Sequence, residues 1–197
     1  MRFPRLPVLP LLLLPLLAVS TLAPAQTPSA PQSAAEARAS ILDQLFTSLR
    51  EASDEAEAAV VELRIRSLWA QGASPAAALL LRRGQRNLQA GVPEEALEDL
   101  DAALTLQDDY ADAWLLRAQA LAANGQPAAA ARDLQQALRL EPRHFPSLEA
   151  LSALQEAEGD SLGALRTHEA VLALDPHIRG GQERLRELRR RALGDAT

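Results

Sequence analysis

Three histidines, His144, His168 and His177, are the side chains best suited to hold a metal ion in this 197-residue chain. A metal site needs convergent ligands, and the short spacings HxxxH and HExxH are both absent from the sequence. There is no cysteine, so neither a thiolate site nor a disulfide framework can form. The sequence therefore predicts no metal site and no cofactor.

Catalytic motifs are also missing. The sequence contains no GxSxG, no Walker-type loop and no GxGxxG, and its spacing suggests no Ser/His/Asp set. Paired carboxylates occur at Glu94-Glu95 and Asp108-Asp109. Both pairs fall at expected helix starts, where acidic groups are stabilised by the helix dipole. We therefore predict neither an enzyme nor a small-molecule substrate.

The histidines and the paired carboxylates lie in a helical segment that repeats every 34 residues, and this segment must position them. Its copies are residues 77–110, 111–144 and 145–178. Four columns of identical residues stay in register through the copies: Gly91, Gly125 and Gly159; Ala96, Ala130 and Ala164; Leu104, Leu138 and Leu172; Leu106, Leu140 and Leu174. A period of this length is typical of solenoid proteins.

The glycine and alanine columns and the nearby prolines have physical reasons. Glycine ends the first helix of a pair, where a left-handed residue is needed, and alanine lets two helix axes approach closely. Pro93 and Pro127 suit the first turn of the second helix, and Pro142 and Pro176 stop it. One such hairpin cannot bury its apolar face, but about three stacked copies can.

These residues resemble the tetratricopeptide repeat. The second copy fits the family pattern best, with Trp114, Ala118, Gly125, Ala130, Leu134, Ala137 and Pro142. The first copy has Asp108 in place of the closing proline, and Asn87 and Gln155 replace the usual large residue at repeat position 11. The resemblance implies an all-α fold, a right-handed α-solenoid of three helical hairpins.

Helices are also expected on both sides of the repeats. Residues 34–72 read as a helical hairpin, which we interpret as a degenerate repeat capping the N-terminal end of the stack; a separate small helical lobe is the alternative. Residues 179–197 follow the break at Gly180-Gly181 and are predicted to be a C-terminal capping helix and tail, because Leu185, Leu188 and Ala192 can cover the last repeat.

The N-terminus has the pattern of a secretory signal peptide. Arg2 and Arg5 precede an apolar stretch, and Ala23-Pro24-Ala25 has the form of a cleavage site. We expect residues 1–25 to be removed after Ala25, residues 26–33 to be a flexible leader, and the protein to be periplasmic or secreted. The alternative is an uncleaved membrane anchor, although a span needs ~20 apolar residues.

The chain is acidic, with a net charge of −6. This disfavours a nucleic-acid partner. Residues 179–197 are the exception because they carry six arginines, namely Arg179, Arg184, Arg186, Arg189, Arg190 and Arg191. We interpret this segment as a solvated helix that neutralises acidic neighbours. Apart from an uncleaved signal, it is the one predicted route to a membrane, through anionic lipid.

The resemblance also implies a concave groove lined by the first helix of each repeat. The groove positions correspond to Leu81, Gln85, Leu88, Gln89, Asp112, Leu115, Gln119, Glu149 and Glu156. An apolar strip with amides beside it favours a protein or peptide partner. The family's carboxylate clamp uses Lys and Asn where this chain has Leu81 and Leu115, so that mode is not expected.

Two further columns vary together. Repeat position 7 is Arg83, Arg117 and then Leu151, and position 23 is Asp99, Asp133 and then Thr167. The arginine and the aspartate are thus lost in the same copy. This predicts two structural salt bridges, Arg83–Asp99 and Arg117–Asp133, each joining the two helices of a hairpin.

The sequence thus favours a non-catalytic scaffold or adaptor of the bacterial cell envelope, which binds a protein or peptide in its groove. The alternative is a membrane-tethered assembly factor, for cytochrome maturation or envelope biogenesis, that keeps its N-terminal anchor.

Overall fold

The structure is a computed structural model that describes residues 34–194, and these residues form nine α-helices and no strand. The helices are α1 (Ala34–Glu51), α2 (Glu55–Ala70), α3 (Pro75–Gln89), α4 (Pro93–Leu106), α5 (Ala111–Ala123), α6 (Pro127–Leu140), α7 (Phe145–Ala157), α8 (Ser161–Leu174) and α9 (Gly181–Leu193). The expected signal peptide and leader, residues 1–33, lie outside the described residues. The all-α prediction is confirmed for the part described.

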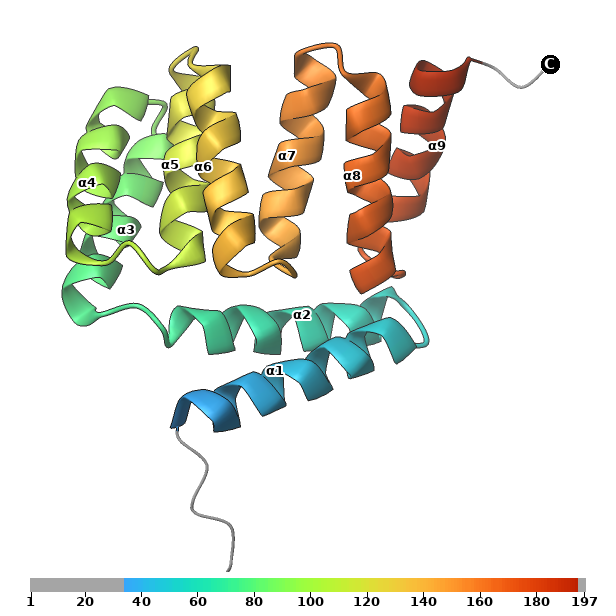
Figure 1. Ribbon diagram of the computed structural model, residues 1–197, viewed down its shortest axis with the longest axis horizontal. Coiled ribbons are helices and arrows are strands. Elements are labelled where there is room, and N and C mark those ends of the chain that lie inside the picture. Colours follow the sequence, from blue (N-terminus) through green and yellow to red (C-terminus); the bar gives the residue numbers. More distant parts are fainter. Residues whose placement is uncertain (1–33, 195–197) are drawn as a thin grey trace, which may run out of the picture. The chain divides into compact units, whose positions relative to one another are not determined.

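Three helical hairpins, α3–α4, α5–α6 and α7–α8, stand side by side (Figure 1). Gly91, Gly125 and Gly159 follow the first helix of each hairpin with φ of 74°, 71° and 82°, the left-handed conformation expected of them. Pro93 and Pro127 each open a second helix. The turns predicted from the glycine column and from the two prolines are therefore the turns seen in the structure.

Small residues set the distance between paired helices. The three column alanines are fully buried: Ala96, Ala130 and Ala164. Gly84 on α3 is buried as well, and a Cβ there would lie 2.8 Å from Leu100 Cγ on α4. A larger side chain at Gly84 would have to push α3 and α4 apart.

Helix α9 packs on the side of the last hairpin that no further repeat covers. Leu188 is fully buried against Ala164 and Leu165, with Leu185 and Ala192 beside it. This confirms the predicted C-terminal capping helix. It closes a solenoid whose last apolar face would otherwise meet water.

The arginines of this segment pair with acids of the same chain. Arg184 and Arg191 both bind Glu156 on α7, and Arg189 binds Glu169 on α8. The remaining three also have partners, in the pairs Arg179–Glu55, Arg186–Glu183 and Arg190–Glu187. The basic charge of α9 is thus largely balanced locally, as a capping helix requires.

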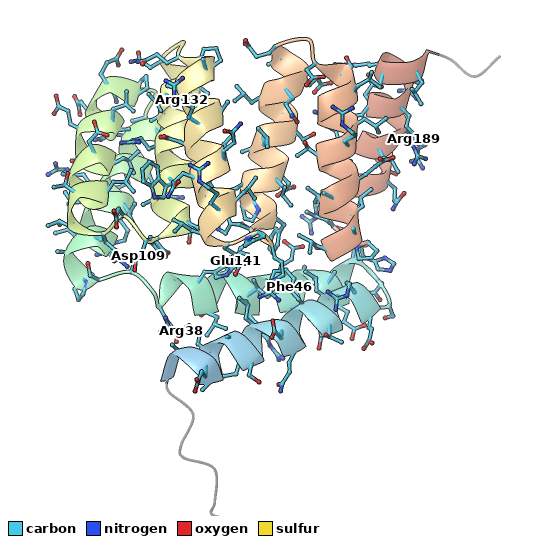
Figure 2. All side chains as sticks on the ribbon, in the orientation of Figure 1. Arg38, Phe46, Asp109, Arg132, Glu141 and Arg189 are labelled. Atoms are coloured by element: carbon cyan, nitrogen blue, oxygen red, sulfur yellow. The ribbon has the colours of Figure 1, made fainter. Side chains whose placement is uncertain are left out.

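The N-terminal hairpin α1–α2 does not stack on the first repeat, and this corrects the expected end cap. It runs across one end of the repeat helices (Figure 1), and α1 reaches α8. Buried Phe46 and Ile65 share a core with Phe145, the first residue of α7, and Leu174 packs against the same core. Figure 2 shows Phe46 facing the ends of the repeats.

Aromatic contacts explain this placement. The ring of Trp69 lies 5.5 Å from that of Phe145 and 4.5 Å from that of His144, and Phe46 lies 6.5 Å from Phe145 in an edge-on arrangement. Arg143 adds an ion pair of 2.7 Å to Asp43 on α1. Large aromatic surfaces dominate burial energetics, so the hairpin follows Phe145 rather than the end of the stack.

Arginine–aspartate pairs join the helices of the first two hairpins. Arg83 Nε donates to the two carboxylate oxygens of Asp99 at 2.6 and 2.7 Å. Arg117 donates to Asp133 through Nε at 2.7 Å and through Nη2 at 3.0 Å. Its Nη1 also donates to Asp101 at 2.8 Å. These are the pairs that the two columns predict, and both are bidentate.

The third hairpin replaces the ion pair by a neutral contact. Thr167 Oγ1 donates to Gln155 Oε1 at 2.7 Å. In the first hairpin Asn87 Nδ2 donates to Asp99 Oδ2 at 3.2 Å. Position 11, where the chain departs from the repeat pattern, therefore supplies a polar partner for position 23 in both copies.

Burial of the two partners is unequal, which predicts unequal mutant effects. Asp133 is 6% exposed, whereas the Arg117 side chain is 23% exposed and has a second ion-pair partner, Asp101, which remains when Asp133 is removed. Arg117→Leu should strand a buried carboxylate and cost ~3–5 kcal/mol. Asp133→Ala should cost only about 1–2 kcal/mol, as measured by urea denaturation.

The control is Thr167→Ala, which removes only a neutral hydrogen bond and should cost about 1 kcal/mol or less. The double change Arg117→Leu with Asp133→Thr copies the third hairpin and should recover much of the loss. Simple additivity of the two single effects would contradict this account of the pair.

Candidate functional site

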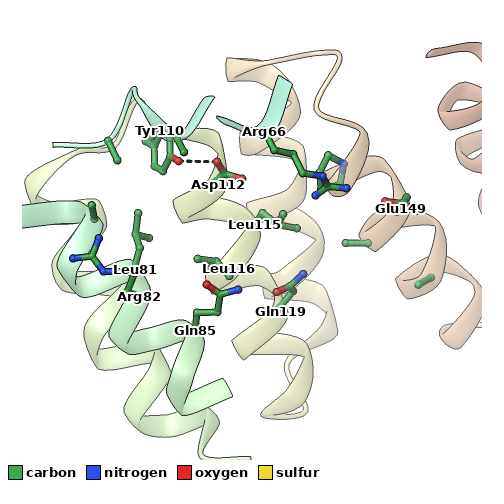
Figure 3. Close-up of a pocket in the computed structure, with 16 residues that line it drawn as sticks. Arg66, Leu81, Arg82, Gln85, Tyr110, Asp112, Leu115, Leu116, Gln119 and Glu149 are labelled. Atoms are coloured by element: carbon green, nitrogen blue, oxygen red, sulfur yellow. Dashed lines mark hydrogen bonds between the residues drawn. The ribbon is translucent and has the colours of Figure 1, made fainter. Parts of the chain in front are cut away.

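A cavity of about 820 Å³ opens on the side of the repeats formed by their first helices, α3, α5 and α7 (Figure 3). Its apolar walls come from alanine and leucine side chains of these helices, including Leu116, Ala150 and Ala153. Ligand sites commonly have this size and mixed lining. It is therefore the candidate functional site.

Several polar side chains in this cavity have no partner among residues 34–194. The amides of Gln85 on α3 and Gln119 on α5 face one another across it (Figure 3). Neither amide, nor the guanidinium of Arg82, takes part in a hydrogen bond or ion pair among the described residues. These groups remain available to an occupant.

Helix α2 forms a further wall of the cavity. Arg66 and Ala70 line it there, and Arg66 reaches toward the side where Glu149 lies (Figure 3). The Arg66 guanidinium lies 4.8 Å from the ring centre of Phe145 and 3.5 Å from the Glu62 carboxylate. The displaced N-terminal hairpin thus contributes directly to the site.

A hydrogen-bond chain runs from the cavity wall into the core. Tyr110 Oη donates to Asp112 Oδ2 at 2.7 Å, and Asp112 Oδ1 lies 3.1 Å from His144 Nε2. His144 Nδ1 lies 2.7 Å from Ser147 Oγ. Burial raises the pKa of Asp112, but the bonds from His144 and Tyr110 outweigh it, so its net pKa is lowered. Burial raises the pKa of Tyr110.

This chain brings together Asp112, His144 and Ser147, a set that sequence spacing did not reveal. Ser147 and His144 are both fully buried. A nucleophilic serine must reach a substrate carbonyl, and this hydroxyl has no access to the cavity. The three residues instead fix the start of α7 against α5, on which the position of Phe145 depends.

A second, apolar cavity of about 390 Å³ lies between the second and third hairpins. It shares Gln119, Ala150 and Ala153 with the first cavity, so the two adjoin. Its lining is otherwise alanine and leucine. We call it the alanine slot.

Six of the nine residues expected in the groove line the first cavity: Leu81, Gln85, Asp112, Leu115, Gln119 and Glu149. Among them Leu81 and Leu115 are only 7% and 6% exposed. The expected apolar strip is therefore mostly core, and the amides and carboxylates are the more accessible part of the wall.

The other three groove residues lie elsewhere. Leu88 is half-buried and packs in the core of the first hairpin. Gln89 is exposed at the end of α3 and does not line the cavity. Glu156 binds Arg184 and Arg191 of the capping helix.

Sequence reasoning missed Arg66, Arg82 and Tyr110. Arg66 lies outside the repeats, so no repeat column could point to it. Arg82 and Tyr110 occupy positions that the family resemblance does not assign to the groove. The one hint in the sequence was Arg82, a charged residue next to the expected groove residue Leu81.

The described residues 34–194 contain no cluster of three or more potential metal ligands. His144 belongs to the hydrogen-bond chain of Tyr110 and Asp112, and His168 Nε2 lies 2.8 Å from the carbonyl oxygen of Gly181. Within the same residues no helix combines the length and apolarity that crossing a membrane requires.

Comparison with known proteins supports a tetratricopeptide repeat protein. Residues 111–144, the second hairpin, match the family model described as tetratricopeptide repeat. A tetratricopeptide-repeat-containing protein of Rhizobium etli is 34% identical over 77 residues, which cover 39% of this chain and 38% of that protein. The chain thus matches well under half of that relative.

Solved structures show the same fold. The first TPR domain of human RPAP3 aligns with a TM-score of 0.56 at 21% identity, over 59% of this chain and 91% of that one. The Sgt2 TPR domain from Aspergillus fumigatus gives 0.56 at 20%, over 60% and 80%. The protein MamA gives 0.55 at 19%, over 81% and 86%. The fold is therefore an α-solenoid of the tetratricopeptide type.

The contact that holds α2 in place includes a buried acid. Asp175, at the end of α8, is fully buried; its Oδ1 accepts the His177 N–H at 3.1 Å and its Oδ2 has no hydrogen-bond partner. Burial raises the pKa of Asp175 to about 6 and the charge of Glu62 on α2 adds to the shift, whereas His177 opposes it.

This raised pKa predicts that stability falls as pH rises. Between about pH 4 and pH 6 the unfolded chain releases the Asp175 proton while the folded chain retains it. Asp175→Asn keeps an acceptor for His177 and removes the charge facing Glu62. It should raise the free energy of unfolding at pH 8 by roughly 1–3 kcal/mol and change it little at pH 4.

Thermal unfolding at the two pH values measures this effect. The control is Asp109→Asn, since Asp109 is exposed and should respond at neither pH. Equal effects of Asp175→Asn at pH 4 and pH 8 would show that the charge of Asp175 does not oppose docking of α2.

Proposed function

We propose that this protein is a non-catalytic scaffold or adaptor that binds a protein or peptide segment in the cavity of α3, α5 and α7. The carrying observation is the set of unpaired polar groups, Gln85, Gln119 and Arg82, on an otherwise apolar concave wall. Side-chain amides can bond the backbone of an extended segment through both their donor and their acceptor. An apolar wall adds burial.

Relatives of the same fold support this proposal. One structure with a TM-score of 0.55 is the first TPR of Spaghetti (RPAP3) bound to an HSP90 peptide, and another with 0.52 is the second TPR domain of human RPAP3 with an HSP70 peptide. Those ligands belong to those proteins, which are 22% and 20% identical to this chain. They support the class of partner and leave its sequence open.

Opposite charges on the two walls would orient an occupant. Arg82 projects from α3, and Glu149 projects from α7 on the other side of the cavity (Figure 3). A segment that binds in one direction satisfies both charges, and the reversed segment meets like charges. Such complementarity contributes specificity more than affinity.

The exposed amides provide the test of this function. Gln85→Arg together with Gln119→Arg should abolish capture of partners from a bacterial envelope fraction, because two long cations then occupy the cavity. Melting temperature should be nearly unchanged, since both residues are exposed. Substituting Leu81 or Leu115 would not serve, because both are buried.

The matched control is Gln135→Arg, at an exposed position of α6 away from the cavity. The captured protein is then purified and its Kd is measured for the three forms. Equal Kd values for the wild type and the cavity variant would rule out the cavity as the binding site.

We further propose that the protein acts in the bacterial cell envelope, periplasmic or secreted after cleavage following Ala25. The support is the basic-then-apolar pattern of residues 1–25 in the sequence. The alternative is a membrane-tethered assembly factor that retains this segment. The intact mass of the protein purified from its source decides: loss of residues 1–25 is expected, and a retained N-terminus would favour the tethered form.

A further inference from the structure

The alanine slot has the features of an anchor site. Buried core residues form its floor: Ala118, Ala130 and Leu134. Exposed small residues form its rim: Ala122, Ala153 and Ala157. The slot thus reaches from the surface to the core between the second and third hairpins. One large apolar side chain of a partner could enter it and be desolvated on all sides, as binding anchors are.

A carboxylate stands next to this slot. Glu149 lies on α7 one turn before Ala153, and it makes no hydrogen bond or ion pair among the described residues. Burial by the cavity walls raises the pKa of its carboxyl group, Arg66 opposes that shift, and the charge of Glu62 adds to it. The positive charge of Arg66 therefore does not outweigh burial, and Glu149 has no ion-pair partner among the described residues.

The charged groups near Glu149 already have partners within the protein. Three carboxylates, Glu62, Asp112 and Glu149, surround the single guanidinium of Arg66. Glu62 pairs with that guanidinium, and Asp112 is hydrogen-bonded by Tyr110 and His144. Glu149 is the carboxylate left over. The remaining cation of the cavity, Arg82, lies on the opposite wall (Figure 3).

We propose that the cavity selects a partner segment in which a bulky apolar residue is adjacent to a basic residue. The apolar side chain fills the alanine slot and the basic side chain pairs with Glu149. This inference rests on the proposed peptide-binding function and specifies its partner. A basic side chain beside this unpaired carboxylate gains a charge-assisted hydrogen bond, and the apolar neighbour in the slot excludes water from one side of it.

Selection from a random peptide library displayed on phage tests this chemistry directly. The bait is residues 26–197 of the wild-type protein, with the cavity variant carrying Gln85→Arg and Gln119→Arg as a counter-selection. Enriched peptides should carry Leu, Met, Phe or Trp next to Lys or Arg. One enriched peptide is then synthesised, and its Kd is measured by fluorescence anisotropy.

Single substitutions then separate the two contacts. Glu149→Gln should weaken binding of this peptide roughly tenfold, and Ala153→Leu, which fills the exposed rim, should weaken it tenfold or more. Ala122→Leu blocks the slot from the α5 side and should weaken binding in the same way. Agreement of the two variants would show that the loss does not come from misfolding of one of them. The controls are Glu51→Gln on α1 and Ala128→Leu on α6, both exposed and outside the cavities. Each should leave the Kd unchanged.

Charge reversal gives the sharpest outcome. Glu149→Arg should shift the enriched residue from basic to acidic while the apolar neighbour remains. Enriched peptides that bind the cavity without a basic residue, or that tolerate Glu149→Gln and Ala153→Leu, would overturn this inference and leave the peptide-binding function standing. Peptides that bind the counter-selection variant equally well would overturn the function itself.

Discussion

The contact of Phe46 and Trp69 with Phe145 is the interaction on which the site depends. Three stacked hairpins alone form an open trough, because α3, α5 and α7 line only its length. Docking of α1–α2 on Phe145 places α2 across the end of these helices and brings Arg66 and Ala70 into the wall. The aromatic core therefore converts a trough into a cavity with a closed end.

Electrostatics opposes this docking in part. The interface holds Asp175, buried with an unsatisfied oxygen, facing Glu62. The hydrogen-bond chain of Tyr110, Asp112 and His144 acts in the other direction, since it fixes the segment before Phe145 by partnered polar groups. Apolar burial, at about 25 cal/mol per Å², outweighs one buried acid. The α1–α2 hairpin is thus held mainly by its rings, and its docking depends on pH through Asp175.

The repeats could be predicted from the sequence because each hairpin is specified locally. Gly91, Gly125 and Gly159 fix the turns, and the joint loss of arginine and aspartate in the third copy points to the Arg83 and Arg117 pairs. The placement of α1–α2 could not be predicted, because it depends on a contact between Phe46 and Phe145, which are distant in sequence. The burial of Leu81 was misjudged for a related reason: a groove position also packs against its own hairpin.

Nuclear Overhauser effects from the Trp69 indole test the closed cavity most directly. The chain has two tryptophans and three phenylalanines, so these ring signals can be assigned with few substitutions. Cross-peaks are expected from Trp69 to the rings of both Phe145 and His144, whose centroids lie 5.5 and 4.5 Å away. Cross-peaks from Trp69 to Phe46 alone, or to side chains of α3, would show that the hairpin does not lie across the repeats and that the cavity is open at that end.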